Sequence, residues 1–443
     1  MKVLLIGSGG REHALAWKIR QSPFLSKLYA APGNAGIAQI AECAAVSSED
    51  VDGLLAFAQE KDIDLTIVGP EGPLALGIVD RFQAAGLKIF GPTQAAAKIE
   101  SSKIFSKELM VRAGVPTADF KIFNESALAK HYLIESESPF VIKADGLAAG
   151  KGVVVAPSCE EAVQAVIKFM EEKSLGEAGK RIIIEERLEG EELSVLVLTD
   201  GENLIPLASA QDHKRLLDMD RGPNTGGMGA YSPCPFLSRE DLHKILDKTV
   251  RPLLSQMAKE KIPYRGILYA GLMLTKNGPF VLEYNARFGD PETQAILPRL
   301  KSDILPLFLE IAEKRFPSVL LDWDERHSLN VVMSAGGYPS TYNKGAVITG
   351  LEKFKESPDQ FVFHAGTNRN ENGDVVTSGG RVLSVTALGE TLKVAQDKAY
   401  QAVYQIRFEG AHFRKDIGRK ALENISWRTF PGEHFQMYRV HYD

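Results

Sequence analysis

A glycine-rich segment enclosed by two apolar, β-branched runs is the strongest constraint on what this chain can fold into. Residues 141–156 read VIKADGLAAGKGVVVA. A Walker A loop, G-x-x-x-x-G-K-[ST], lies between a strand and a helix. Here only three residues separate Gly146 from Gly150, and Gly152 stands where the Ser or Thr that binds magnesium would be. The segment therefore predicts a loop between two strands and argues against a P-loop fold.

Small residues let the backbone N–H groups of such a loop close around a phosphate. Lys143 and Lys151 would add positive charge beside it. Two interpretations of the loop alone remain open, a polyphosphate-binding hairpin and a solvated glycine-rich hairpin. Other segments have to decide between them.

A second segment, FVLEYNARFGDPE at residues 280–292, predicts a pair of metal ligands. Residues two apart project from the same face of a strand, so Glu283 and Asn285 present a carboxylate and an amide oxygen side by side. Such a partial set suits Mg²⁺, which takes its remaining ligands from phosphates and water. Arg287, next on that face, could bind a carboxylate or phosphate with two hydrogen bonds. The alternative is an ordinary polar strand face.

A third segment, RIIIEERLEGEE at residues 181–192, is an apolar strand that ends in acidic residues. An adenine could stack on apolar side chains there, and Glu192 could accept hydrogen bonds from ribose hydroxyls. The alternative is a solvated strand end.

The segment 211–233, QDHKRLLDMDRGPNTGGMGAYSP, is rich in Gly, Asn, Asp and Pro. We predict a long loop rather than a strand or helix, and long loops of this kind are commonly functional. Asp212 could bind a substrate ammonium group, and Lys214 a phosphate or carboxylate. Gly226 and Gly227 permit a close approach of the backbone to a ligand.

The first 92 residues alternate short apolar runs with helical patterns, which is typical of βαβ units in an open parallel sheet. The turn after the first run, GSGGREHA, begins like a dinucleotide fingerprint. Glu12 stands where that fingerprint needs a glycine, and no acidic residue ends the following strand. An NAD site is therefore disfavoured, whereas a phosphate-binding turn for a smaller ligand stays open.

Composition narrows the class of protein. The chain has 443 residues and a net charge of −5 without a basic run, which disfavours nucleic-acid binding. No apolar run approaches the ~20 residues of a membrane span. Its three cysteines are scattered, as expected of reduced thiols in a cytoplasmic protein.

Together these segments resemble the ATP-grasp superfamily, and within it the phosphoribosylamine–glycine ligase family. The resemblance runs through motifs such as GSGGREHALAW, IKADGLAAGKGVVVA, GPNTGGMGAYSP, EYNARFGDPETQ and GGRVLSVTALG, and covers about residues 1–420 in order. It implies an α/β and α+β multidomain fold. The expected parts are an N-terminal open parallel-sheet domain (1–100), an ATP-grasp domain (101–327) with a mobile lid (118–190), a small C-terminal α+β domain (328–425), and a tail of unknown role (426–443).

The resemblance also implies site residues. ATP would bind at Lys103, Lys143, Gly146, Gly150, Lys151, Gly152, Glu185, Glu186, Leu188, Glu192 and Lys214. The other substrates would bind at Gly9, Gly10, Asn34, Glu71, Asp212, Gly226, Gly227, Arg287 and Arg381. Lys143, Arg287 and Asp212 would act directly in the reaction, and Glu283 and Asn285 would bind the metal.

The implied activity joins glycine to 5-phosphoribosylamine with hydrolysis of ATP to ADP and phosphate, through glycyl phosphate, in purine biosynthesis. The partners are these three small molecules, with Mg²⁺ or Mn²⁺ as cofactor, and no nucleic acid or membrane. The segment AGLMLT lacks the metal-binding carboxylate that many ATP-grasp enzymes carry there. Whether the site binds one metal ion or two therefore stays open. A monomer is expected, with a weak dimer as the alternative. Another ATP-grasp ligase or carboxylase, and a nucleotide-binding sensor, are the competing functions.

Overall fold

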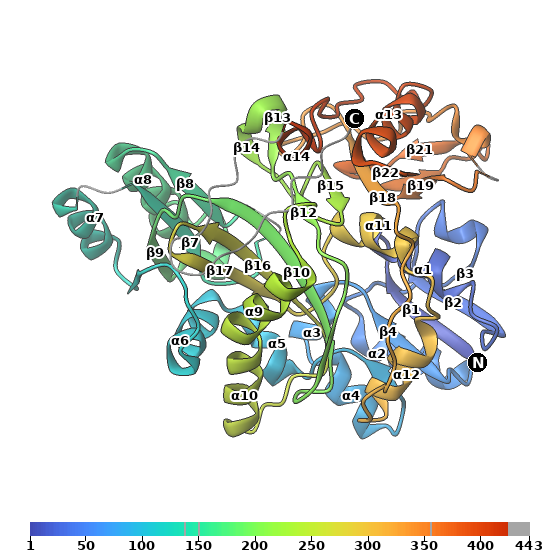
Figure 1. The fold of residues 1–443 in the computed structure, drawn as a ribbon, viewed down its shortest axis with the longest axis horizontal. Coiled ribbons are helices and arrows are strands. Elements are labelled where there is room, and N and C mark those ends of the chain that lie inside the picture. Colours follow the sequence, from blue (N-terminus) through green and yellow to red (C-terminus); the bar gives the residue numbers. More distant parts are fainter. Residues whose placement is uncertain (137–138, 149–150, 355–356, 424–443) are drawn as a thin grey trace.

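The computed structural model describes residues 1–136, 139–148, 151–354 and 357–423. Gly150 and the segment 426–443 lie outside these described residues. Within the described ranges, no helix is long and apolar enough to cross a membrane. The expected α/β and α+β architecture is confirmed, with three sheet-containing units packed together and a fourth projecting from them (Figure 1).

The N-terminal unit is an open parallel sheet of strand order β3-β2-β1-β4-β5. Its strands are β1 (Lys2–Gly7), β2 (Lys27–Pro32), β3 (Glu42–Cys43), β4 (Leu65–Val68) and β5 (Ile89–Phe90). Its helices are α1 (Gly10–Ile19), α2 (Val51–Glu60), α3 (Glu71–Ala75) and α4 (Ile78–Ala84). The break between α3 and α4 falls at Gly77, whose φ of +80° a glycine adopts without strain.

Two helices, α5 (Gln94–Ser101) and α6 (Lys103–Ala113), lead out of this unit toward the lid. Ser102 separates them with extended backbone, and its hydroxyl accepts from the N–H of Phe105 to cap α6. The linker therefore consists of two helices that meet at Ser102. The break turns the start of α6 toward the glycine-rich loop.

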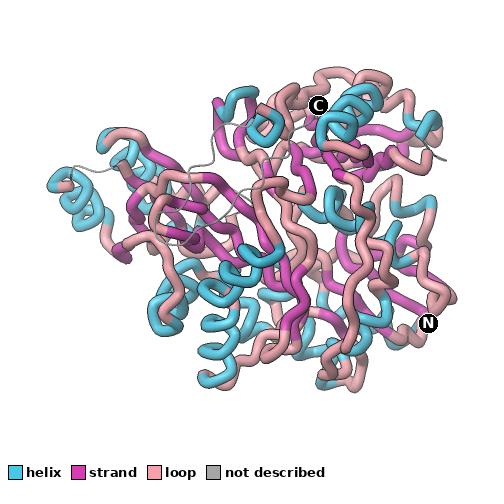
Figure 2. The backbone as a smooth tube through the Cα atoms, in the orientation of Figure 1, coloured by secondary structure: helices cyan, strands magenta, loops and turns pink. Residues whose placement is uncertain are grey.

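The lid is a four-stranded antiparallel sheet in the order β6-β9-β7-β8. It contains β6 (Phe120–Phe123), α7 (Ser126–Glu135), β7 (Phe140–Ala144), β8 (Val153–Ala156), α8 (Cys159–Val166), a π-helical turn (Ile167–Glu171) and β9 (Ile182–Glu186). Its helices cover the side of the sheet away from the rest of the molecule (Figures 1 and 2). The buried side chains of its core all come from residues 129–184, so the lid packs around a hydrophobic core of its own.

The central unit is the antiparallel sheet β11-β10-β16-β17. It contains β10 (Glu191–Thr199), β11 (Leu204–Pro206), α9 (Arg239–Thr249), α10 (Arg251–Lys259), β16 (Gly266–Thr275), β17 (Gly278–Asn285), α11 (Glu292–Ile296) and α12 (Leu305–Ala312). β16 and β17 pair as an antiparallel hairpin that turns at residues 276–277. Its register shifts so that Gly271 faces Glu283 while Leu272 faces Val281, which leaves Leu282 as a bulge beside the predicted metal ligands.

The C-terminal unit is built on the sheet β12-β15-β18-β22-β19. It contains β12 (Gln211–Asp212), β15 (Gly229–Ser232), β18 (His327–Ser334), β19 (Gln360–His364), β20 (Thr367–Arg369), β21 (Val375–Thr377), β22 (Arg381–Gly389), α13 (Leu392–Val403) and α14 (Arg419–Leu422). Two of its strands come from 211–233, which also forms the hairpin β13 (Arg215–Leu217) and β14 (Arg221–Asn224). The prediction that 211–233 is a loop was therefore wrong, because pairing with β18 overrides its glycine-rich composition.

Residues 412–420, which we call the C-terminal clasp, hold the β13–β14 hairpin from the far end of the chain. The guanidinium of Arg414, 1% exposed, lies 2.8 Å from Asp220 Oδ1 and 2.8 Å from Asp416 Oδ1. The ammonium of Lys420 lies 2.8 Å from the other oxygen of Asp220. Asp220 has a φ of +51°, a left-handed conformation that costs a non-glycine residue about 1 kcal/mol. The clasp therefore stabilises a strained turn next to the residues of the predicted site.

Replacing Arg414 with Met should destabilise the protein by on the order of 3 kcal/mol, because Asp220 and Asp416 would lose the cation that compensates their partial burial. Urea unfolding of Arg414→Met measures this change. Lys393→Met, which removes an exposed ion pair with Asp397 on α13, is the control and should leave the midpoint unchanged. Equal midpoints for the two variants would show that the clasp contributes nothing to stability.

Candidate active site

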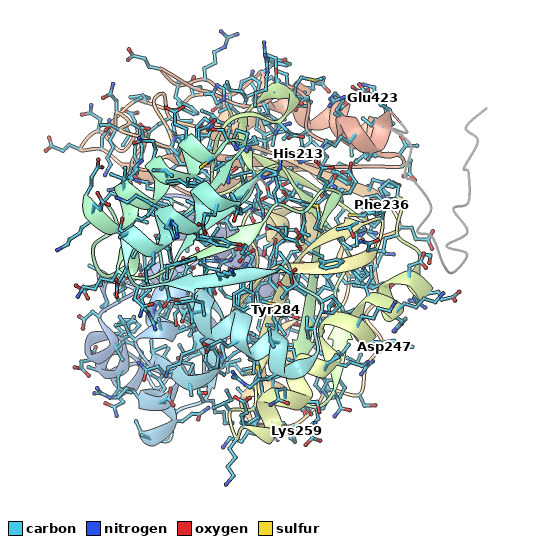
Figure 3. The ribbon with its side chains drawn as sticks, turned by 90° about the vertical axis from the view of Figure 1, so that its left-hand side faces the viewer. His213, Phe236, Asp247, Lys259, Tyr284 and Glu423 are labelled. Carbon is cyan, nitrogen blue, oxygen red and sulfur yellow. The ribbon has the colours of Figure 1, made fainter. Side chains whose placement is uncertain are left out.

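One cavity of about 850 Å³ lies where the lid, the central unit and the two terminal units meet. Figure 3 shows Tyr284 of β17 near the middle of the molecule, whereas Asp247 and Lys259 lie toward its edge on α9 and α10. Sixteen of the predicted site residues line the cavity. They are Glu71, Lys103, Lys143, Gly146, Gly152, Glu185, Glu186, Leu188, Glu192, Asp212, Lys214, Gly226, Glu283, Asn285, Arg287 and Arg381.

The glycine-rich loop connects β7 and β8, two paired antiparallel strands, as its sequence predicts. Asp145 at its start ties it to α6, because its Oδ1 accepts from the Ser102 hydroxyl at 2.9 Å and from the Ile104 N–H at 3.2 Å. The ammonium of Lys103 donates to the carbonyl of Gly146 at 3.2 Å. These contacts connect the loop to the first turn of α6. Lys151 is exposed and does not line the cavity.

Three lysines converge on the carboxylate of Glu283 from α6, from β7 and from the turn after β12. The ammonium of Lys214 lies 3.8 Å from Glu283 Oε1 and 3.3 Å from Glu192 Oε2. Burial alone would raise the pKa of Glu283, but Lys214, Lys143 and Lys103 lower it to about 2. This end of the cavity therefore combines an ionised carboxylate with a surplus of positive charge, which suits a metal-bound polyphosphate.

Glu185 links two lysines in the cavity wall. Its Oε2 lies 2.9 Å from the ammonium of Lys143 and 3.1 Å from that of Lys107, and its side chain is 2% exposed. The bulged Leu282 contributes its carbonyl, which accepts from Lys143 at 3.0 Å. The second oxygen of Glu185 has no hydrogen-bond partner among the described residues. It is a buried acceptor that a ligand donor could satisfy.

Arg287, which lines the same cavity, is held between two carboxylates. Its Nε donates to Glu71 Oε2 at 3.0 Å, and its Nη2 lies 2.8 Å from Glu100 Oε1. Arg287 lowers the pKa of Glu71 to about 2, whereas burial raises the pKa of Glu100 to about 7. The site thus places one cation between a strongly acidic carboxylate and a weakly acidic one.

Asp212 and Glu292 form a carboxylate pair at the cavity wall. Burial and the neighbouring Glu292 raise the pKa of Asp212 well above its usual range. Glu292 Oε1 accepts from the Ser194 hydroxyl at 2.8 Å, and Asp212 Oδ1 accepts from the N–H of His213 at 2.6 Å. Two neighbouring acids, Glu292 buried and Asp212 partly buried, favour the binding of a cation between them.

Arg381 reaches the cavity from β22 of the C-terminal unit. Its Nη2 lies 3.1 Å from Asp290 Oδ2, and its Nη1 donates to the carbonyls of Gly226 and Asp290. It therefore fixes the glycine segment 226–227 against the segment after β17. Gly227, at φ +105°, packs beside Pro291 and Asp212 and lies behind the cavity lining.

The structure places Gly9, Gly10 and Asn34 away from the cavity lining. The N–H of Gly9 donates to Glu12 Oε2 at 2.6 Å. Asn34 Nδ2 donates to the carbonyls of Ser8 and His364, both at 2.8 Å, so it links the N-terminal and C-terminal units. In this arrangement Gly9 and Asn34 have structural partners, and the assignment of Gly9, Gly10 and Asn34 to a substrate stays a prediction.

Three described parts of the chain match family models of phosphoribosylglycinamide synthetase. Its N domain matches residues 1–100, its ATP-grasp (A) domain residues 101–293 and its C domain residues 328–420. The chain belongs to the phosphoribosylglycinamide synthetase family. The interpretation of the motifs as an ATP-grasp ligase of this family is thereby confirmed.

Relatives in this synthetase family match over nearly the whole chain. The phosphoribosylamine–glycine ligase of Vibrio vulnificus is 52% identical over 95% of this chain and 99% of its own length, and that of Yersinia pestis is 53% identical over the same shares. The crystal structure of the Thermotoga maritima ligase superposes with a TM-score of 0.80 at 33% identity, covering 94% of this chain and all of that one. A biotin carboxylase from Campylobacter jejuni, 16% identical over 96% of this chain and 95% of its own, has a TM-score of 0.73 and shares the fold.

Several residues of the synthetase cavity were missed by sequence reasoning, namely Glu100, Lys107, Glu292 and Lys420. One signal could have found Lys107: it lies four residues after Lys103, so both lie on the same face of α6. The other three had no such signal. Lys420 comes from the C-terminal clasp, and only the tertiary structure brings it to the cavity.

Gly227→Ala should destabilise the synthetase fold by about 2–3 kcal/mol, because a Cβ there would lie 2.4 Å from Pro291 Cδ and 2.7 Å from Asp212 Oδ1. Gly373→Ala is the matched control, since Gly373 has a φ of +85° and open space around it. That control carries only the cost of the left-handed backbone, about 1 kcal/mol. Urea unfolding of both variants separates the two contributions, and equal losses would rule out the close packing at Gly227.

Proposed function

We propose that this chain joins glycine to 5-phosphoribosylamine, converting ATP to ADP and phosphate. The observation that carries the proposal is a single cavity that two sets of charged groups line. Lys103, Lys143 and Lys214 surround Glu283, and Arg287 and Asp212 belong to the same lining. A chain of the synthetase family that holds both sets in one cavity can bring a triphosphate to a carboxylate substrate.

The proposed chemistry needs no side-chain nucleophile. An oxygen of the glycine carboxylate attacks the γ-phosphorus of ATP, the bond to the bridging oxygen breaks, and ADP leaves. The amine of phosphoribosylamine then attacks the carbonyl carbon of glycyl phosphate, loses a proton and displaces inorganic phosphate. Holding the reactants in alignment can lower the activation barrier by about 7–11 kcal/mol. Alignment can therefore account for the catalysis without a covalent intermediate on the enzyme.

The nucleotide is proposed to lie between the lid and the central unit. The adenine would stack on apolar wall residues such as Leu188, with its exocyclic amine donating to the unpartnered oxygen of Glu185. Glu192 would accept from the ribose hydroxyls. A guanine presents a carbonyl oxygen at the position of that amine, which Glu185 would repel, so this contact favours ATP over GTP.

The ligand set formed by Glu283 and Asn285 fits Mg²⁺ or Mn²⁺. Glu283 stays ionised down to a pH of about 2, and both residues line the cavity with oxygen donors. When bound, the ion would neutralise charge on the phosphates. Lys103, Lys143 and Lys214 are placed to bind the same phosphates directly and to stabilise the transferred group.

Glycine is proposed to bind between Arg287 and Asp212. Its ammonium group would supply the positive charge that the Asp212–Glu292 pair lacks, and its carboxylate would face Arg287. Phosphoribosylamine would bind beside Glu71, with Arg381 toward the sugar phosphate. All three substrates are small molecules, and we propose that the enzyme acts in the cytoplasm as a monomer.

The lid is proposed to move as a unit over the bound nucleotide. It has its own hydrophobic core, and its loop is tied to α6 through Asp145 and Lys103. Acyl phosphates react with water, so closure would protect the intermediate.

Purified protein supplied with MgATP, glycine and freshly generated phosphoribosylamine should release ADP and phosphate in equal amounts with the amide. Coupled ADP detection together with mass spectrometry of the product measures this. ADP release that does not depend on glycine, or formation of AMP and pyrophosphate, would contradict the proposal.

Glu283→Ala should reduce turnover by at least about a thousandfold, because it removes a metal ligand from the phosphate end. Glu202→Ala, an exposed residue in the turn between β10 and β11 of the same sheet, is the control and should retain full turnover. Circular dichroism and thermal unfolding show whether both variants are folded. Full activity of folded Glu283→Ala would remove Glu283 from the metal site.

A further inference from the structure

Glu185, Lys143 and Lys107 form a buried group of three charges with a net charge of +1. Both ammonium groups contact the same carboxylate oxygen, at 2.9 Å and 3.1 Å, and the three side chains are 2–9% exposed. A buried carboxylate without a cation is costly by several kcal/mol, so Glu185 requires at least one of these lysines at all times. One lysine would satisfy that requirement.

Lys143 is the lysine of this pair that can change partner. Besides Glu185 it contacts only the carbonyl of Leu282 among the hydrogen bonds and ion pairs of the described residues, and it lines the cavity near Glu283. If it binds nucleotide phosphate, it must give up part or all of its contact with Glu185. The strength of ATP binding then depends on what remains to compensate Glu185.

Lys107 is held in place by several contacts besides Glu185. Its ammonium donates to the Thr117 hydroxyl at 2.7 Å and to the Ala118 carbonyl at 3.4 Å, and it lies 5.4 Å from the centre of the Phe120 ring. The Thr117 hydroxyl in turn donates to the Val281 carbonyl at 2.7 Å, which orients its lone pairs toward Lys107. A side chain fixed in this way cannot follow Lys143 to the nucleotide.

We infer that Lys107 is the permanent counter-ion of Glu185 and that its presence releases Lys143 to bind the phosphates of ATP. Lys107 is thus a positioning residue: it touches neither substrate nor metal and acts through Glu185 and Lys143. The inference rests on the proposed function only in taking ATP as the ligand.

This role predicts that the affinity for ATP falls as the pH becomes alkaline. Burial lowers the pKa of Lys107 to about 8, with Glu185 and Glu186 of β9 and Lys143 of β7 as the charged groups that face it. Above that pH Lys107 loses its proton, Glu185 keeps only Lys143, and the affinity for ATP falls. Burial also lowers the pKa of Lys103, so the test compares proteins that all retain Lys103.

The experiment measures binding of Mg²⁺ with a non-hydrolysable ATP analogue by isothermal titration calorimetry, with kcat measured in parallel. Lys107→Met should weaken binding at pH 7 by about ten- to a hundredfold, the effect of losing one buried compensating charge. It should lower kcat as well, because Lys143, held by Glu185, no longer stabilises the transferred group. Arg112→Met is the control on the same helix. It removes an ion pair with Glu260 that lies outside the cavity lining and should leave binding unchanged.

Two further variants separate positioning from packing. In a Glu185→Gln background no buried carboxylate holds Lys143, so adding Lys107→Met should weaken binding less than about threefold. Lys107→Arg, which stays protonated, should bind as the wild type does at pH 7 and lose less affinity than the wild type between pH 7 and pH 9.5.

Three results would overturn the inference: unchanged binding by folded Lys107→Met, an equal effect of Lys107→Met in both backgrounds, or the wild-type alkaline loss in Lys107→Arg. If Lys107→Met does not fold, the comparison of Lys107→Arg with the wild type decides alone. Failure of the proposed function gives a different result, because analogue binding would follow the expected pattern while no amide forms from glycine and phosphoribosylamine.

Discussion

The balance of charge inside the cavity is the constraint on which the rest of the structure depends. Three lysines surround Glu283, two contact Glu185, and Arg287 lies between Glu71 and Glu100. Buried charges are tolerated only when each has a partner, so every cation here is matched by a carboxylate or a carbonyl. A polyphosphate and a metal ion could enter by exchanging these partners, which requires the protein to hold more cations than its own carboxylates need.

The fold meets this constraint by drawing the charged groups from separate sheets. Lys143 and Glu185 come from the lid, Glu283 and Arg287 from β17 and the residues after it, and Arg381 from the C-terminal unit. The lid has a core of its own, whereas one hydrophobic cluster combines residues of the N-terminal, central and C-terminal units. A lid with its own core over a base that shares one core suits the partner exchange that we propose.

Sequence reasoning identified the strands of the hairpins, the parallel sheet and sixteen of the residues that line the cavity. It failed where a distant segment decides local structure. The glycine-rich segment 211–233 forms strands because β18 supplies hydrogen-bonding partners. The helical linker breaks at Ser102, where Asp145 of the lid accepts from the serine hydroxyl. The assignment of Gly9, Gly10 and Asn34 to a substrate stays a prediction.

The sequence by itself determined the family, the strand–loop–strand character of the phosphate segment and the pairing of Glu283 with Asn285 on one strand face. These are local properties, set by side-chain periodicity and by the absence of a helix after the loop. The tertiary structure alone decided which charges meet: that Lys107 shares Glu185 with Lys143, that Glu100 binds Arg287, and that Lys420 reaches the cavity from the chain's C-terminal clasp. Contacts between residues far apart in the chain depend on how whole sheets pack, and no local pattern encodes that packing.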